Sequence, residues 1–181
     1  MQLAKYQKTS GLAERPKYFV MLWMLFGEPL VRSSIPGTKF RIQILRFFGA
    51  KIGDGVVVKP RVQIKYPWKL SIGDNSWIGE RVWIDNLAEV SIGHDVCVSQ
   101  GAYLCTGSHD WSRPTFDLVI KPIILEAHSW VCAKAIIGPG SVLGQGAVVG
   151  LGCVFSGRLK PWQITSAVGA KPINLKKRKI V

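Results

Sequence analysis

Aliphatic residues recur at every sixth position through most of the stretch from Ile52 to Phe155, and a glycine often follows them. This spacing fits neither the 3.6-residue period of an α-helix nor the two-residue alternation of a plain strand. A fixed short period is typical of a solenoid, in which each repeat packs on its neighbours. The recurring positions, here called anchors, are Ile52, Val58 and Ile64; Ile72, Ile78 and Ile84; Ile92, Val98 and Leu104; Leu125, Val131 and Ile137; and Leu143, Val149 and Phe155.

Each group of three anchors predicts one triangular coil of three short strands. The anchor and the residue two positions before it should point inward, because side chains along a strand alternate between its faces. Gly, Asn or Asp after an anchor would supply the left-handed backbone conformation of a corner. The sequence thus predicts an all-β solenoid, a parallel β-helix of about five coils over residues 52–160, ended by Pro161.

The extra residues of the repeat all fall at one corner. Coils one and two each carry two additional residues at their third corner, and coil three carries about 15 residues beyond the basic 18, after Leu104. We therefore expect an extended loop at residues 105–122, on the corner that bulges in three successive coils.

Residues 1–51 are predicted to form a polar tail and a helical cap. The apolar run at 18–31 is shorter than the roughly 20 residues that span a bilayer. It can pack on the solenoid or on a partner subunit, or it can make shallow contact with a membrane interface, helped by Lys17 and Arg32. Residues 38–48 predict an amphipathic helix, stopped by Gly49, that covers the open first coil, since an uncovered coil is an exposed edge.

The charge lies at the two ends of the chain. The net charge is +13, yet residues 71–170 hold 6 basic and 8 acidic side chains. A nucleic-acid-binding protein would show a basic stripe on its folded body, so no nucleic-acid partner is expected. Basic ends, including the tail at 161–181, fit an anionic membrane surface or anionic small molecules.

The cysteine pattern indicates a reducing compartment. Cys97, Cys105, Cys132 and Cys153 form no CxxC pair, which favours reduced structural thiols. No secretory signal pattern is evident. We therefore expect a cytoplasmic protein, located at the inner membrane surface if the apolar run at 18–31 touches lipid.

Four short stretches carry a family resemblance over about residues 40–160. They are Leu-Arg-Phe-Phe-Gly-Ala-Lys-Ile-Gly at 45–53, Tyr-Pro-Trp-Lys-Leu at 66–70, Cys-Thr-Gly-Ser-His-Asp at 105–110 and Lys-Pro-Ile at 121–123. With the repeats, they resemble the left-handed β-helix acyltransferases, and among these the colanic-acid and exopolysaccharide O-acetyltransferase group. The resemblance implies a left-handed coil, a homotrimer with active sites between neighbouring prisms, and acetyl-CoA as co-substrate.

The chemistry implied is acetyl transfer to a hydroxyl of a sugar or exopolysaccharide precursor. Such transfer needs a base for the hydroxyl proton and a donor for the developing oxyanion. His109, at the mouth of the long loop, is the predicted general base, because the pKa of histidine lies near 6.5. Transfer should be direct, since no cysteine or serine is paired with a base in this motif.

Two further sets of residues are predicted to bind substrates. Aromatic rings stack on sugar faces and charged groups bond sugar hydroxyls, which suits side chains of the loop, and Asp110 can instead orient the His109 ring or form a turn. The predicted acceptor contacts are Asp85, Asn86, Asp110, Trp111 and Arg113, with Phe116 and Asp117 nearby. By the resemblance, the predicted coenzyme contacts are Trp130, Ala133, Leu151 and Ser156.

The C-terminal end departs from the family pattern, with Ser-Gly-Arg at 156–158 and Ala-Val-Gly-Ala at 167–170. Arg158, Lys160 or Lys171 could supply the charge that relatives place there. No metal is expected, because His94 and His128 share the first corner, away from His109. The alternatives are an N-acyltransferase acting on an amino sugar and a non-catalytic β-helix scaffold.

Overall fold

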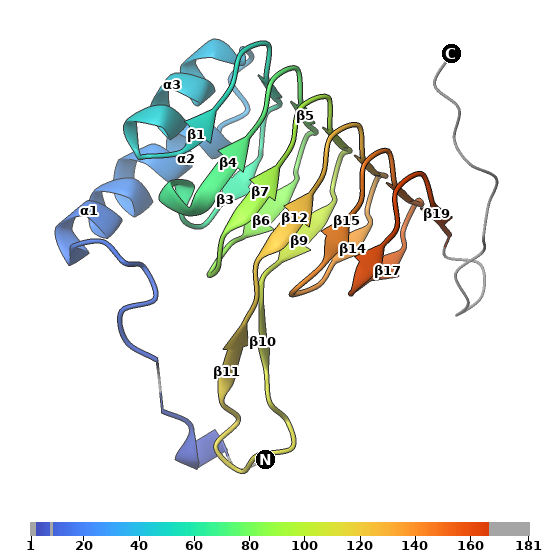
Figure 1. The fold of residues 1–181 in the computed structure, drawn as a ribbon. Helices are drawn as coiled ribbons and strands as arrows, with labels where there is room; N and C mark the ends of the chain where they lie inside the picture. Colours follow the sequence, from blue (N-terminus) through green and yellow to red (C-terminus); the bar gives the residue numbers. More distant parts are fainter. Residues whose placement is uncertain (1–2, 8, 167–181) are drawn as a thin grey trace.

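Three parallel sheets form the faces of a triangular prism, with helices over one end and a hairpin projecting from its side (Figure 1). The computed structural model describes residues 3–7 and 9–166. Face A is the sheet of β1 (Lys51–Ile52), β4 (Leu70–Ile72), β7 (Val90–Ile92), β12 (Ile123–Leu125), β15 (Val142–Leu143) and β18 (Arg158–Leu159). Face B is the sheet of β2 (Val57–Val58), β5 (Trp77–Ile78), β8 (Cys97–Val98), β13 (Trp130–Val131), β16 (Val148–Val149) and β19 (Ile164–Thr165).

Face C is the sheet of β3 (Gln63–Ile64), β6 (Trp83–Asp85), β9 (Tyr103–Cys105), β14 (Ile136–Ile137) and β17 (Val154–Phe155). The chain visits the faces in the order A, B, C, so each coil has three corners. The first corner joins A to B, the second joins B to C, and the third returns from C to A.

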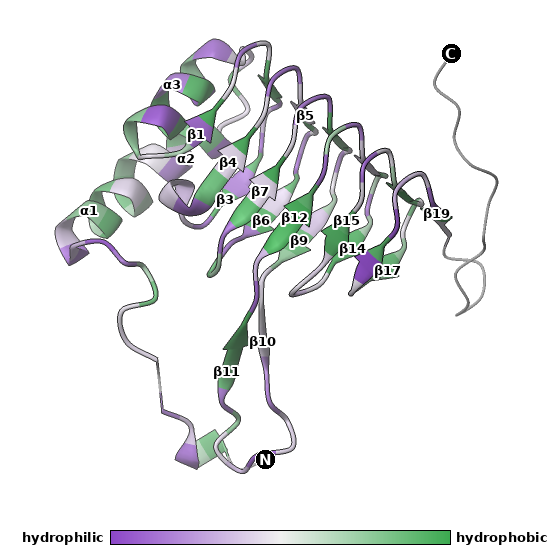
Figure 2. Cartoon of the chain, in the orientation of Figure 1, coloured by the Kyte–Doolittle hydropathy of each residue, from purple (hydrophilic) through white to green (hydrophobic). Residues whose placement is uncertain are grey.

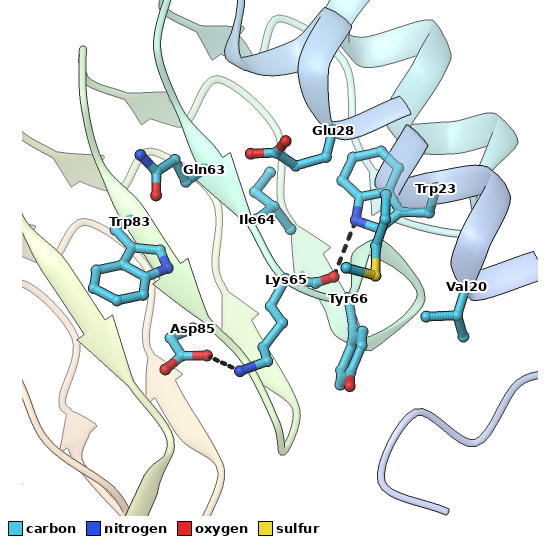
Figure 3. A pocket seen from close by; sticks show the side chains of 10 residues that line it. Val20, Trp23, Glu28, Gln63, Ile64, Lys65, Tyr66, Trp83 and Asp85 are labelled. Atoms are coloured by element: carbon cyan, nitrogen blue, oxygen red, sulfur yellow. Dashed lines mark hydrogen bonds and ion pairs between the residues drawn. The ribbon is translucent and has the colours of Figure 1, made fainter. Parts of the chain in front are cut away.

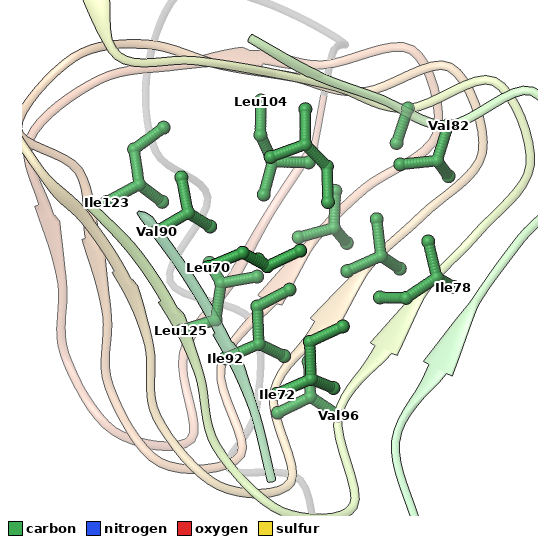
Figure 4. Close-up of a cluster of buried hydrophobic side chains, with 14 of the residues drawn as sticks. Leu70, Ile72, Ile78, Val82, Val90, Ile92, Val96, Leu104, Ile123 and Leu125 are labelled. Carbon is green, nitrogen blue, oxygen red and sulfur yellow. The ribbon is translucent and has the colours of Figure 1, made fainter. Parts of the chain in front are cut away.

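The anchors stack in register and fill the prism. Ile52 pairs with Ile72, and Ile84 pairs with Leu104. Every anchor except Phe155 is buried, and Figure 4 shows the aliphatic side chains meeting at the centre of the coils. Figure 2 shows the hydrophobic residues concentrated on the strands and the hydrophilic ones at the corners. The predicted parallel β-helix is confirmed.

Glycines after the anchors serve close stacking rather than left-handed geometry. A Cβ added at Gly73 would lie 2.6 Å from the backbone nitrogen of His94 in the next coil. The left-handed residue comes two positions later, as in Asn75 with φ of 57°. The left-handed corner conformation exists, but two residues later in each repeat than predicted.

The β-helix continues into a sixth coil beyond the predicted end at Pro161. Leu159 pairs with Leu143, and Thr165 pairs with Val149. The third corner after Phe155 is two residues shorter than the repeat requires, so Leu159 falls out of the six-residue spacing. Pro161 occupies a corner.

The N-terminal helices cover the open end of the first coil, as predicted. They are α1 (Lys17–Leu22), the π-helix η2 (Trp23–Gly27), α2 (Glu28–Arg32) and α3 (Lys39–Phe47). Trp23 and Leu45 reach the core. The buried Arg41 side chain donates to the carbonyl oxygens of Val31, Ser33, Ile35 and Gly37, which fixes the segment between α2 and α3.

The insert after Leu104 forms an antiparallel hairpin rather than an irregular loop. Strands β10 (Gly107–His109) and β11 (Leu118–Ile120) pair with His109 opposite Leu118. The hairpin leaves the third corner and extends away from the prism, and the short turn η1 (Leu3–Lys5) lies beside its distal end (Figure 1). This corner also holds the short helix η3 (Pro67–Lys69) in coil one.

Candidate active site

The imidazole of His109 is held by one residue of the same hairpin, Phe116, through its backbone carbonyl and its ring. Its Nδ1 lies 2.8 Å from the carbonyl oxygen of Phe116. Because a carbonyl oxygen can only accept, Nδ1 carries the proton and the neutral ring presents Nε2 as its acceptor. The Phe116 ring stacks on the imidazole at 4.2 Å between centroids, with planes 1° apart. Phe116 therefore fixes the orientation of the ring through both its carbonyl and its side chain.

Phe116 makes both contacts from an unusual backbone conformation. Its φ is 50°, in the left-handed region that bulky residues rarely adopt. Strained backbone of this kind concentrates at functional sites. The conformation directs the Phe116 carbonyl and ring back toward His109 across the hairpin turn.

The tip of the hairpin is a charged turn. Asp110 accepts hydrogen bonds from the backbone nitrogen and hydroxyl of Ser112 and pairs with Arg113 at 3.4 Å. The bonds from Ser112, with the charge of Arg113, lower the pKa of Asp110. Arg113 also pairs with Asp117 at 3.1 Å. Asp110 thus forms the turn, and the orienting partner of His109 is Phe116 instead.

The Trp111 side chain is 78% exposed at this tip, which leaves its indole face open to solvent.

Asp85 lies at the base of the hairpin within a small polar group on face C. Its carboxylate pairs with Lys65 Nζ at 2.9 Å and accepts from the Tyr103 hydroxyl at 3.3 Å. Burial, then the neighbouring Cys105 and Asp85, raises the pKa of Tyr103 above its usual range, so its hydroxyl remains a donor.

The pocket of Figure 3 opens beside Asp85. It has a volume of about 330 Å³ and lies between the N-terminal helices and strands β3 and β6. The indole of Trp23 closes one side by donating to the carbonyl oxygen of Lys65 at 3.0 Å.

Asn86 is fully buried inside the third corner. Its Oδ1 accepts from the Tyr66 nitrogen at 3.0 Å, and its Nδ2 donates to the carbonyls of Tyr66 at 2.7 Å and Lys69 at 3.1 Å. With its amide engaged by the backbone and no exposed surface, Asn86 stabilises the corner rather than contacting an acceptor.

The predicted coenzyme residues fall on different corners. Ala133 and Leu151 are stacked on the second corner, where the Gly152 nitrogen donates to the Ala133 carbonyl at 3.0 Å. Trp130 is on face B and donates to the Ser99 hydroxyl at 2.8 Å. Ser156 lies on the third corner, where its hydroxyl donates to the Pro139 carbonyl.

The charged candidates lie near the C-terminal coil. Arg158 is exposed on face A, and Lys160 follows β18. Lys171, the segment 167–170 and the basic end of the tail lie outside the described residues.

The four cysteines are free thiols. Burial, followed by the nearby Cys153 and Cys97, raises the pKa of Cys132 to about 11. Burial also raises the pKa of Cys153. Since the thiolate is the nucleophilic form, both thiols are poor nucleophiles at neutral pH.

His94 and His128 share the first corner, as predicted. Their rings meet edge to face at 4.9 Å, and Asp95 lies 2.8 Å from His94 Nδ1 and 3.9 Å from His128 Nδ1. The three side chains place their possible ligand atoms within 4.8 Å of one another. The hydrogen bond from His94 and the charges of both histidines lower the pKa of Asp95. The group belongs to the first corner, whereas the hairpin leaves the third.

Comparison with known proteins gives a strong partial sequence match. The chain is 44% identical over 102 residues to the putative colanic acid biosynthesis acetyltransferase WcaF of Escherichia coli. The match covers 56% of this chain and 56% of that protein, so the chain spans little more than half of the curated relative's length. No family model matches the chain.

Solved structures match over nearly the whole chain. A hexapeptide-repeat acetyltransferase from Vibrio cholerae superposes with a TM-score of 0.81 and 19% identity, covering 98% of both chains. The fold is that of the hexapeptide-repeat acetyltransferases, the left-handed β-helix. A maltose O-acetyltransferase from Clostridium difficile shares it with a TM-score of 0.74 and 20% identity, covering 97% of this chain and 92% of that one. The V. cholerae protein has also been solved in complex with acetyl-CoA, with a TM-score of 0.75 and 20% identity over 97% of this chain and 96% of that one.

Two features of this site could not be predicted from the sequence. The Phe116 carbonyl that orients His109 is a backbone atom brought near by the turn. Tyr6, whose ring lies edge-on to His109 with centroids 5.6 Å apart, comes from the N-terminal tail. No periodic signal links residue 6 to the insert.

Replacing Asn86 with Ala should separate its structural role from an acceptor role. The change removes three hydrogen bonds from a buried corner and should lower the free energy of unfolding by about 1–3 kcal/mol. Denaturant unfolding measures this loss. A fully stable Asn86→Ala protein with a raised KM for the acceptor would contradict the structural assignment.

Proposed function

We propose that the protein is an acetyl-CoA-dependent O-acetyltransferase that acts on a hydroxyl of a sugar or polysaccharide precursor. The observation that carries the proposal is the orientation of His109, whose Nδ1 is bonded to the Phe116 carbonyl, which leaves Nε2 as the nitrogen that can accept a proton. The 44% identity to the putative colanic acid acetyltransferase supports the same chemistry and the same class of acceptor.

In the proposed reaction, His109 Nε2 takes the proton of the acceptor hydroxyl as the oxygen attacks the thioester carbonyl. The C–S bond then breaks, and the coenzyme leaves as a thiol after taking the proton from the imidazolium. The bond between Nδ1 and the Phe116 carbonyl stabilises that imidazolium and keeps Nε2 aimed at the acceptor. The raised pKa values of Cys132 and Cys153 support direct transfer over a thiol intermediate.

A second copy of the chain is proposed to complete the site. The hairpin of His109 leaves the third corner, while Ala133 and Leu151 lie on the second corner, at the other edge of face C. One prism therefore holds the base and the coenzyme residues at opposite edges of one sheet. Joining the third corner of one copy to the second corner of the next brings them together.

Face C has the composition of a buried surface. Its outward side chains include Trp83 stacked on Tyr103 with centroids 4.4 Å apart, followed by Ile136 and Val154. Exposed apolar surface of this extent marks an interaction site. Contact between unlike edges forms a closed ring when the rotation closes, and we propose a homotrimer with face C turned toward its axis.

Substrate contacts are proposed on both sides of this junction. Acetyl-CoA would lie along the second corner of one copy, against Ala133, Leu151 and the nearby Trp130, with Ser156 on the third corner of the joined copy facing it. The sugar would meet Trp111 and Arg113 at the tip of the partner's hairpin, and Asp85 at its base.

Loss of the base is the central test. His109→Ala should lower kcat at least about 100-fold with the oligomer unchanged, because no other group takes the hydroxyl proton. Activity is measured as free coenzyme A released with glucose, maltose or p-nitrophenyl galactoside as acceptor. His94→Ala, a histidine at another corner, is the matched control, and near-normal activity of His109→Ala would refute the mechanism.

The same assay distinguishes oxygen from nitrogen as the acceptor atom. Glucosamine offers an amine and hydroxyls on one ring, so mass and alkaline hydrolysis of its product identify the acetylated atom. An alkali-stable amide as the sole product would favour the N-acyltransferase alternative. Failure of acetyl-CoA to bind by calorimetry would favour a scaffold.

A charge on face C should break the trimer. Ile136→Asp would bury an unpaired carboxylate at the proposed axis, so light scattering should show a change from about 60 kDa, three chains of 20.0 kDa, to a single chain. Ile124→Asp is the matched control, since Ile124 is 40% exposed on face A and Ile136 is 37% exposed on face C. An intact Ile136→Asp trimer would rule out this interface.

The N-terminal helices are proposed to touch the inner membrane surface. They bury Trp23 and Val31 against the prism, while their other side exposes Tyr18, Met21, Met24, Leu25 and Phe26. Lys17 and Arg32 flank this apolar side. None of the helices in the described part of the chain has the length and hydrophobicity of a membrane span.

Vesicle binding tests this contact. Substituting Glu for both Met24 and Leu25 should weaken co-sedimentation with phosphatidylglycerol vesicles at least about tenfold, because two apolar side chains proposed to enter the membrane interface are replaced by carboxylates. Phosphatidylcholine vesicles and Ile124→Asp serve as controls. Unchanged binding would exclude this surface, and a broken trimer would assign the helices to the partner subunit instead.

A further inference from the structure

The N-terminal tail is tied to the corner from which the catalytic hairpin leaves. The Lys69 ammonium is almost buried, and its three donors meet the carbonyls of Leu12 at 2.8 Å and Leu87 at 2.9 Å and the carboxylate of Glu14 at 2.7 Å. A buried charge persists only when its partners satisfy it. Lys69 therefore pins the tail at Leu12 to the third corner.

A second bond holds the next residue of the tail. The indole nitrogen of Trp68 donates to the Ala13 carbonyl at 2.6 Å.

From this attachment the tail can reach the hairpin. Leu87 of coil two, whose carbonyl accepts from Lys69, also lies against Gly107 at the start of the hairpin. A Cβ added at Gly107 would lie 2.9 Å from the Leu87 side chain. The six residues from Leu12 back to Tyr6 span at most about 20 Å, and the hairpin carries His109 about 10 Å from the corner. The N-terminal tail and the hairpin thus both leave the third corner and meet again at His109.

The tail and the hairpin meet through one side chain of the tail, that of Tyr6. Among residues 3–7, Tyr6 alone is partly buried, while Leu3 stays 62% exposed despite its apolar side chain. The Tyr6 ring meets the His109 imidazole at 67° with centroids 5.6 Å apart, next to the stacked Phe116 ring. Edge-to-face pairs at such distances are attractive and directional.

We propose that Tyr6 is a positioning residue that holds the His109 imidazole in its productive orientation. The inference rests on the proposed function, since it gives the ring a reaction to serve. Rotation of the ring by half a turn about the Cβ–Cγ bond would put Cδ2 in the place of Nδ1, which breaks the bond to the Phe116 carbonyl and displaces Nε2. Tyr6 and Phe116 together restrict that rotation, and Tyr6 keeps water from one side of the base. The contact is aromatic, so the phenol hydroxyl is dispensable.

Two variants separate this role from general stability. Tyr6→Ala should lower kcat about two- to tenfold, the range expected for one lost aromatic pair, with the KM for acetyl-CoA unchanged. Tyr6→Phe should restore wild-type kcat, because the ring is retained. Leu3→Ala, which removes an exposed apolar side chain of the same tail, is the matched control.

Nitrogen–proton correlation NMR of ¹⁵N-histidine-labelled protein reports the ring directly. The chain has three histidines, and His94→Gln, His109→Gln and His128→Gln assign their signals. Tyr6→Ala should move the His109 ring signals and mix its two tautomers, while the His94 and His128 signals stay in place. His109 signals that are identical in wild type and Tyr6→Ala would overturn the proposal, as would an equal loss of kcat in Tyr6→Phe.

The two proposals fail separately. If Tyr6→Ala moves the His109 signals while His109→Ala retains activity, the positioning contact stands and the proposed base is wrong. If His109→Ala is inactive and Tyr6→Ala leaves both kcat and the ring signals unchanged, the base stands and the positioning role is wrong.

Discussion

Stacking of parallel coils at the strand spacing is the constraint on which this molecule depends. Every coil must place its aliphatic anchors directly over those of the coil before it, as Ile52, Ile72 and Ile92 do on face A. The contact is so close that a side chain at Gly73 would collide with the next backbone. Residues can be added only where the chain leaves this register, at a corner, and the hairpin occupies such a place.

Much of the fold could be predicted from the sequence because the repeat exposes the register directly. The anchors, the face assignments and the helical cap follow from spacing and from the need to cover an open coil. The sixth coil was missed because the corner after Phe155 is two residues short, which moves Leu159 out of period although its strand still pairs with β15. The hairpin was expected as a loop, since three-residue strands such as β10 leave almost no alternation to read.

The candidate site, like the fold, has parts with a sequence signal and parts without one. The place of His109 in a long insert could be read from the sequence, because the repeat breaks after Leu104, and its role as the base stays a prediction. The groups that orient its ring could not be predicted. A backbone carbonyl carries no sequence signal, and Tyr6 reaches the ring only through the attachment of the tail at Lys69. Asn86 shows the reverse error, because an amide at the bulging corner suggested a ligand contact where the corner itself required its hydrogen bonds.

The hairpin at the third corner has a mechanical consequence. It is joined to the prism by two strand ends, and its length affects neither the stacking of the anchors nor the second corner. A change in the length of the hairpin or in the residues at its tip would alter the position of the His109 imidazole. The hydrophobic interior and the second corner would stay as they are. Under the proposed function, this architecture would let the range of acceptors change in evolution with little cost to folding, because the segment proposed to contact the acceptor is separate from the strands that must stack.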